Sequence, residues 1–114
     1  MKKKIICFDL DNVICTTKKN YYSKSTPKKN IIKLINRLYY KKYKIIIFTA
    51  RGMGTYKANL KVVENKYRNL TEKQLKKWNV NYHKLILGKP SYDIYIDDKN
   101  YGFKRNWYKN FKVK

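Results

Sequence analysis

The sequence predicts an α/β protein with a mostly parallel sheet, arranged as a Rossmann-like three-layer sandwich. Two observations carry this prediction: short apolar runs show no alternation with polar residues, and a helical repeat of apolar residues joins the first two runs. Strands without alternation are typical of parallel sheets, which are covered on both faces. The chain has 114 residues, the size of one domain with a single core, so we expect one domain over residues 1–114.

Four strands are predicted, and reactive side chains follow their ends or the loops after them. The predicted strands are residues 4–8, 44–48, 85–87 and 94–96. Between the first two, apolar residues recur at helical spacing from Ile31 to Tyr39. This repeat predicts a helix that starts after Thr26 and ends near Lys42. Strand, helix and strand at this spacing form a right-handed βαβ unit.

The remaining segments are assigned from composition and spacing. Residues 12–26 are polar and rich in Ser, Thr, Asn and Tyr, which favours a loop or a flap over the entrance to a site. Helices are predicted over 56–68 and 71–79, the second with Thr71 as its N-cap. The aromatic residues within 101–114 have the spacing of a helix packed back on the sheet.

The composition is strongly basic, with 29 Lys and Arg residues against 7 Asp and Glu and a formal net charge of +22. One interpretation is a nucleic-acid-binding surface. The other is a lysine-rich composition carried on solvated faces, because only four of these residues are arginine, the side chain that base readout favours. A hydrophobic content of 43% excludes a disordered basic tail.

No apolar run approaches the roughly 20 residues of a membrane span, and the apolar run after Lys4 is too short for a signal peptide. We therefore expect a cytoplasmic protein without membrane contact. The two cysteines have neither zinc-finger spacing nor a CxxC arrangement. Cys7 is expected in the core, whereas Cys15 lies in the flap, where it could be exposed.

The aspartates gather in two short clusters, each beside a predicted strand. Ligand sites of open α/β sheets lie beyond the carboxyl ends of the strands, where polar side chains from several strands meet. The residues expected there are Asp9, Asp11, Thr49, Lys89, Asp97 and Asp98. These types suit phosphoryl transfer: a carboxylate attacks phosphorus, a second carboxyl group handles the proton, and hydroxyl and ammonium groups bind the phosphoryl oxygens.

Four motifs in this order resemble those of the haloacid dehalogenase superfamily of phosphatases. They are Phe8–Val13, Phe48–Arg51, Gly88–Pro90 and Tyr95–Lys99. Within that superfamily, the run that begins Thr49-Ala50-Arg51-Gly52-Met53 resembles the small capsule-polysaccharide-biosynthesis phosphatases. Residues 12–26 are too few for the cap domain of larger members, so the resemblance implies a capless core. A partner subunit could then cover the open site, which would make the protein a homo-oligomer.

The resemblance implies a role for each matching residue. Asp9 would be the nucleophile and Asp11 the general acid and base. Thr49, Ala50, Arg51 and Lys89 would bind the substrate, and Thr49 and Lys89 would also take part in catalysis. For Arg51, pairing with a carboxylate of the site is an equal alternative. Mg²⁺ would be the cofactor, held by Asp9, Asp11, Asp97 and Asp98.

The function expected from these features is Mg²⁺-dependent hydrolysis of a phosphomonoester through an aspartyl-phosphate. The substrate partner is expected to be a sugar phosphate or a similar small metabolite. One alternative is a polynucleotide 3′-phosphatase, for which a basic open surface would suit a strand end. A second alternative is a non-catalytic binding module that keeps the fold.

Overall fold

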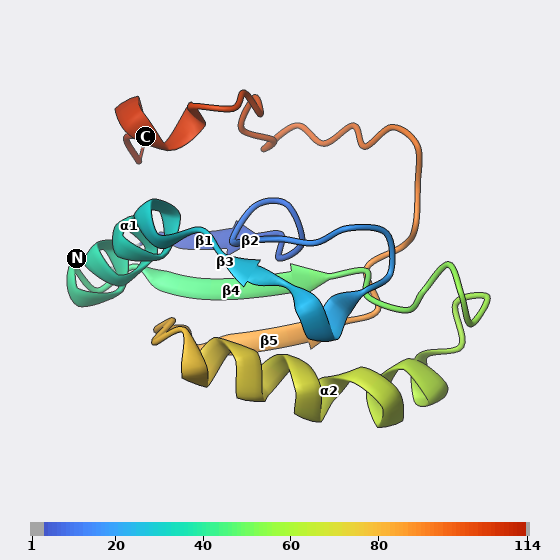
Figure 1. Cartoon of the computed structure of the whole chain (residues 1–114). Coiled ribbons are helices and arrows are strands. Elements are labelled where there is room, and N and C mark those ends of the chain that lie inside the picture. Colours follow the sequence, from blue (N-terminus) through green and yellow to red (C-terminus); the bar gives the residue numbers. More distant parts are fainter. Residues whose placement is uncertain (1–3, 114) are drawn as a thin grey trace.

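The computed structural model describes residues 4–113 and contains a parallel sheet of three strands (Figure 1). The strands are β1 (Ile5–Phe8), β4 (Lys44–Thr49) and β5 (Lys84–Leu87), in the spatial order β1-β4-β5. The register places Phe8 beside Ile47 and Ile47 beside Leu85. The predicted α/β class, its parallel sheet and the absence of a cap are confirmed.

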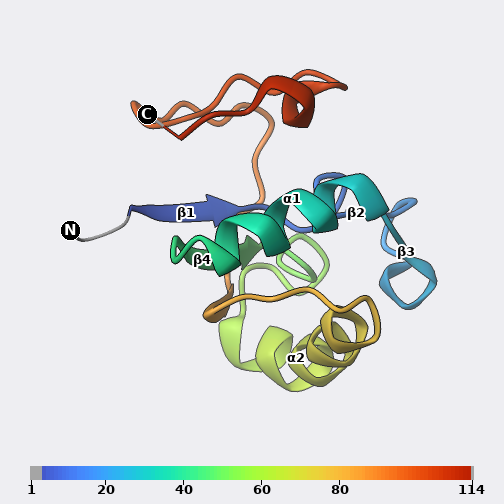
Figure 2. The same ribbon diagram turned by 90° about the vertical axis from the view of Figure 1, so that its left-hand side faces the viewer.

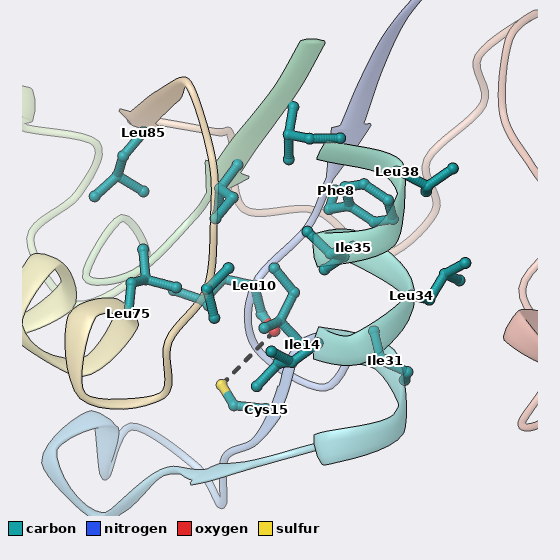
Figure 3. Packing of buried hydrophobic residues seen from close by; sticks show 14 of the residues in the cluster. Phe8, Leu10, Ile14, Cys15, Ile31, Leu34, Ile35, Leu38, Leu75 and Leu85 are labelled. Atoms are coloured by element: carbon teal, nitrogen blue, oxygen red, sulfur yellow. Dashed lines mark hydrogen bonds between the residues drawn. The ribbon is translucent and has the colours of Figure 1, made fainter. Parts of the chain in front are cut away.

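Two helices cover one face of this sheet. They are α1 (Lys29–Tyr40) and α2 (Leu60–Lys77). Phe8, Ile47 and Leu85 share the buried face, while their chain neighbours Ile46 and Ile86 are half-buried on the other. Figure 3 shows α1 side chains such as Ile35 directed at Phe8 and Leu10, with Leu75 of α2 on the Leu85 side. The core therefore lies between the sheet and the two helices.

The helix boundaries correct two predictions. Instead of two helices over 56–68 and 71–79, one continuous helix runs from Leu60 to Lys77. Asn59 caps it by accepting a hydrogen bond from the backbone N–H of Val62 at 3.3 Å. Thr71 is a buried residue in the middle of α2 and not an N-cap. The helix α1 begins at Lys29 and not directly after Thr26, because Thr26 and Pro27 form a strand.

The predicted flap is a small antiparallel unit of β2 (Cys15–Thr16) and β3 (Thr26–Pro27), with a 3₁₀ turn η1 (Tyr22–Lys24) between them. Cys15 of this unit has no exposed surface, and its thiol donates to the backbone carbonyl of Leu10 at 3.7 Å. Cys7 is the exposed cysteine. Both expectations for the cysteines were therefore wrong. Cys7 is exposed because its side chain points to the face of the sheet that the helices leave open.

The predicted fourth strand is not formed. Residues 91–106 are exposed throughout and carry neither helix nor strand, with Ile94 at 78% and Ile96 at 92% exposure. The apolar stretch between Asp93 and Asp97 is only three residues long, so few ladder hydrogen bonds would offset the cost of ordering it. Figures 1 and 2 show this segment rising from the end of β5, and its later part then lies beyond β1 and α1, on the side away from α2.

The aromatic tail forms a short 3₁₀ turn, η2 (Trp107–Asn110), and not the longer helix predicted over 101–114. Trp107 still packs back on the core, with its ring 6.2 Å from that of Phe8. No helix within residues 4–113 is long and apolar enough to cross a membrane.

Candidate active site

The loop after β1 brings Asp9 to the carboxyl end of the sheet. Leu10 and Ile14 are fully buried and anchor this loop in the core, and Asn12 takes the left-handed conformation that closes its turn (φ 65°). The carboxylate of Asp9 accepts a hydrogen bond from the backbone N–H of Leu10 at 2.8 Å. Burial raises the pKa of Asp9, and the nearby ammonium of Lys89 opposes this shift.

Lys89 reaches Asp9 from the end of β5. Gly88 has a left-handed φ of 95°, and after this turn the backbone N–H of Lys89 donates to the carbonyl of Thr49 at 3.1 Å. The Nζ atom of Lys89 then lies 3.6 Å from Oδ2 of Asp9. Burial lowers the pKa of Lys89, but a hydrogen bond with Tyr92 and the charge of Asp9 outweigh this and raise it. The structure therefore brings Lys89 and Asp9 together at the carboxyl end of the sheet, where both were expected.

Asp11 is held by Arg51, which is 1% exposed. The Nε atom of Arg51 donates to both carboxylate oxygens, at 3.2 and 3.1 Å, and its Nη2 atom donates to Oδ1 at 3.0 Å. Thr17 of the flap also donates to Oδ1, at 2.6 Å. Of the two alternatives for Arg51, pairing with a site carboxylate is therefore realised, and the same side chain still lines the pocket.

The other side of Arg51 is bound by α2. Its Nη1 atom donates to Thr71 at 3.1 Å and to Gln74 at 2.6 Å, and Gln74 in turn donates to the backbone carbonyl of Tyr22 at 2.6 Å. Sequence reasoning missed Thr71 and Gln74 as parts of the site. A signal was available, because the two are polar residues three apart on the buried face of a helix.

Tyr22 fixes the flap to the loop after β4. Its hydroxyl accepts a hydrogen bond from the backbone N–H of Gly52 at 3.2 Å, and its ring lies 5.1 Å from Cζ of Arg51. Gly52 has a φ of 76°, and a Cβ atom at this position would overlap the ring of Tyr67. These contacts, together with the hydrogen bond from Thr17 to Asp11, hold the predicted flap beside Asp11.

An open pocket of about 490 Å³ lies between the flap, the loop after β4 and the loop after β1. Its lining includes Asp9, Asp11, Lys19, Ala50, Arg51 and Ser91. Thr49 is fully buried instead, and its hydroxyl accepts a hydrogen bond from the backbone N–H of Arg51 at 3.2 Å. In this arrangement Thr49 supports the loop, whereas Asp9, which pairs with Lys89, lines the pocket.

The carboxylates expected to hold Mg²⁺ are not gathered. Asp97 and Asp98 lie in the exposed segment, where Asp97 accepts hydrogen bonds from the hydroxyl of Tyr95 at 3.2 Å and the backbone N–H of Lys99 at 2.9 Å. Within residues 4–113, no group of three His, Cys, Asp or Glu side chains is placed to hold a metal ion. Since Asp11 is taken by Arg51, the arrangement does not fit a complete Mg²⁺ site.

The fold, together with the matches to known proteins given below, defines the class of protein: a capless, haloacid dehalogenase-like phosphatase. Residues 4–95 match the family described as polynucleotide kinase 3 phosphatase, and the chain belongs to this family. A search of curated proteins found no match. The finer resemblance to capsule-polysaccharide phosphatases stays a prediction.

Solved structures agree with the fold. A structural-genomics target from Vibrio cholerae aligns with a TM-score of 0.80 and 27% identity, covering 86% of this chain and 82% of that one. A chain of the Pnkp1/Rnl/Hen1 complex gives 0.58 and 20% identity over 84% of this chain and 31% of that chain. A chain of the Pnkp1/Rnl/Hen1 RNA repair complex gives 0.56 and 21%, covering 81% and 27%. At these identities the last two show the fold alone.

Proposed function

We propose that this phosphatase removes a terminal 3′-phosphate from a polynucleotide strand. The observation that carries the proposal is the Asp9–Lys89 pair, which lies at an open pocket without a cap. An uncapped pocket leaves room for a substrate that continues as a chain beyond its reacting phosphate. The basic composition would attract a polyanion to this opening. Membership of the polynucleotide kinase 3 phosphatase family supports the same substrate class.

The proposed reaction has two steps. Asp9 attacks phosphorus, so that a bond forms between its carboxylate oxygen and phosphorus while the bond from phosphorus to the 3′-oxygen breaks. The leaving oxygen takes a proton and departs as the 3′-hydroxyl. The resemblance assigns this proton to Asp11, which must exchange its ion pair with Arg51 for a proton before the step. Water then gives a proton to Asp11 and attacks the aspartyl-phosphate, which releases inorganic phosphate and restores Asp9.

The other residues supply charge and position. The ammonium of Lys89, 3.6 Å from Asp9, would offset the negative charge of the incoming phosphate. Arg51, Thr17 and Gln74 hold the carboxyl group of Asp11 and the flap in one arrangement. Magnesium dependence remains a prediction from the sequence, and no step is assigned to the ion.

The test is phosphate release from a panel of substrates with and without Mg²⁺. The panel contains an oligonucleotide with a 3′-phosphate, the same oligonucleotide with a 5′-phosphate, and glucose and ribose phosphates. We expect the 3′-phosphorylated strand to give the highest kcat/KM. Faster turnover of the sugar phosphates would overturn the proposal and favour the small-metabolite alternative. Release from no substrate would favour the non-catalytic module.

Specificity for a strand should also respond to salt. Binding that neutralises several phosphates weakens as salt rises, with a log–log slope of roughly −0.7 per contact for single strands. We expect KM for the oligonucleotide to rise steeply between low and moderate salt. The matched measurement uses glycerol phosphate, for which KM should rise much less.

A further inference from the structure

Two tyrosines stand beside the lysine of the site. The rings of Tyr92 and Tyr95 lie 5.0 Å apart with an interplanar angle of 34°. The Nζ atom of Lys89 lies 5.2 Å from the centre of the first ring and 5.0 Å from the centre of the second. Attraction between a cation and aromatic rings at this range holds the pair next to the same ammonium that reaches Asp9.

The tyrosine pair is not part of the hydrophobic core. Tyr92 is 45% exposed and Tyr95 is 43% exposed, whereas Trp107, an aromatic residue that packs on the core, is 9% exposed. Lys89 itself is only 7% exposed. Tyr92 and Tyr95 thus contact a buried cation while much of their ring surface faces solvent. Rings that are held in place and yet exposed offer a flat surface to a ligand.

The pair also lies beside the pocket. Ser91, directly before Tyr92, lines the pocket together with Asp9. The hydroxyl of Tyr95 donates to Asp97 at 3.2 Å, which ties this ring to the chain that follows it. A phosphate placed at Asp9 would therefore have an aromatic surface close by, on the Lys89 side.

We infer that Tyr92 and Tyr95 form a stacking platform for the terminal base of a strand whose 3′-phosphate lies at Asp9. This inference rests on the proposed function and assigns a base-binding subsite to it. Stacking of a base on an aromatic side chain contributes about 1–3 kcal/mol and tolerates any base, because every base has a flat π face. A sugar phosphate has no such face, so the platform would select nucleotides over small metabolites.

The experiment compares two 3′-phosphorylated oligonucleotides that differ only in their last residue. One ends in an ordinary nucleotide, and the other ends in a stable abasic tetrahydrofuran residue. We expect the wild-type protein to favour the ordinary end by roughly 5- to 150-fold in kcat/KM, the equivalent of one stacked base. In the double variant Tyr92→Leu and Tyr95→Leu, this ratio should fall towards one.

Two further variants serve as controls. Tyr40→Leu removes a tyrosine that is 71% exposed at the end of α1. Tyr40 lies shortly before the start of β4, at the end of the sheet opposite to the site. This variant should keep both the activity and the ratio of the wild type. The variant Tyr92→Phe with Tyr95→Phe retains the rings without the hydroxyl groups, so its ratio should stay near that of the wild type.

The outcomes separate this inference from the proposed function. If the wild-type protein dephosphorylates both oligonucleotides equally well, the platform is wrong and the polynucleotide substrate stands. An unchanged ratio in the double leucine variant would also overturn the platform. If neither oligonucleotide reacts while sugar phosphates do, the proposed function itself fails. Because the readout is a ratio within one protein sample, a loss of folded protein does not imitate the expected result.

Discussion

Arg51 and Asp97 are both charged residues that the sequence places in one site, but the structure treats them in opposite ways. Arg51 is 1% exposed and its donors meet Asp11, Thr71 and Gln74. Asp97 lies in a segment that is exposed from residue 91 to residue 106. Among the described residues, no buried side-chain nitrogen or oxygen lacks a hydrogen-bond partner. The site therefore combines a packed part around Arg51 with a solvated part after Lys89.

This difference teaches where each part of the function resides. The packed part fixes Asp11 and the flap through residues from three separate segments, so its geometry is set before a substrate arrives. The solvated part presents Tyr92, Tyr95 and Asp97 on an exposed segment, where the contacts with Lys89 and the hydrogen bond between Tyr95 and Asp97 take the place of buried packing. We therefore expect the packed part to keep Asp11 in one arrangement and the solvated part to adjust when a substrate binds.

The largest effect is expected at the junction of the two parts, at Asp9. Replacing Asp9 with Asn removes the attacking carboxylate but keeps the size of the side chain. We expect kcat/KM for the 3′-phosphorylated oligonucleotide to fall by at least about 10³-fold. Glu72→Gln, which removes one exposed carboxylate from α2, is the matched control and should retain activity. Activity that survives in Asp9→Asn would place the nucleophile elsewhere.

A large effect on stability is expected in the packed part. Arg51→Gln leaves the carboxylate of Asp11 without its ion pair, and removal of one partner of a buried pair costs about 3–5 kcal/mol. Because the side chain of Asp11 is 20% exposed, we expect about 3 kcal/mol, at the low end of this range. Urea unfolding measures the loss. Arg105→Gln, at an exposed position, should change the unfolding free energy little.

A smaller effect is expected where the two parts join through Gly88. Gly88→Ala places a Cβ atom at a φ of 95° and 2.8 Å from Cδ1 of Leu60. We expect about 1–2 kcal/mol of destabilisation and a lower kcat, because the turn aims Lys89 at Asp9. Gly102→Ala is the control, since a Cβ atom there meets nothing within 4 Å. Equal behaviour of the two variants would show that the turn at Gly88 tolerates a side chain.

The packed part also shows what the sequence could and could not predict. Asp9, Asp11 and Lys89 were predictable because each follows a strand, and parallel strands bring their carboxyl ends together. The hydrogen bonds of Gln74 to Arg51 and to the carbonyl of Tyr22 join residues 23 and 52 positions apart in the chain. Contacts at that separation depend on how α2 packs, which local patterns do not specify.

The solvated part shows the opposite limit. The residues Ile94-Tyr95-Ile96 have the local composition of a strand, yet they are exposed. Strand propensity describes how a residue fits a pleated, half-buried surface and needs a neighbouring strand to pair with. Among residues 4–113, no fourth strand pairs with β1, which therefore forms an edge of the three-stranded sheet. Composition therefore indicated the strand propensity of residues 94–96 but not whether a neighbouring strand would pair with them.

A test of Mg²⁺ dependence can decide whether residues 97–98 bind the metal, as the resemblance implies, or stay in the exposed arrangement of the structure. If Asp98 is a metal ligand, as the resemblance implies, Asp98→Asn should raise the Mg²⁺ concentration for half-maximal activity several-fold. This result would require residues 97–98 to approach Asp9 in the working enzyme. An unchanged Mg²⁺ requirement would favour the exposed arrangement. Asp93→Asn, in the same exposed segment, is the matched control.

The smallest effect on stability is expected for the ion pair between Arg68 and Glu64 on α2, whose side chains are both partly exposed. Arg68 donates to Glu64 at 2.6 Å and to the carbonyl of Leu85 at 3.0 Å, which ties the helix to β5. The hydrogen bond from Arg68 lowers the pKa of Glu64. A carboxyl group whose pKa is lowered on folding adds stability above its unfolded pKa and loses it as the pH falls through its folded pKa.

We therefore expect Glu64→Gln to cost about 0.3–0.5 kcal/mol at pH 7, the usual contribution of such a helical pair. The cost should shrink as the pH is lowered from about 4.5, near the unfolded pKa of glutamate, towards 3. Urea unfolding at several pH values measures it, and the same substitution in an Arg68→Met background provides the reference. A cost that is independent of pH, or equal in both backgrounds, would mean that the pair adds nothing measurable. In contrast to Arg51, Arg68 would then tie α2 to β5 through the carbonyl of Leu85, with no measurable contribution from its ion pair with Glu64.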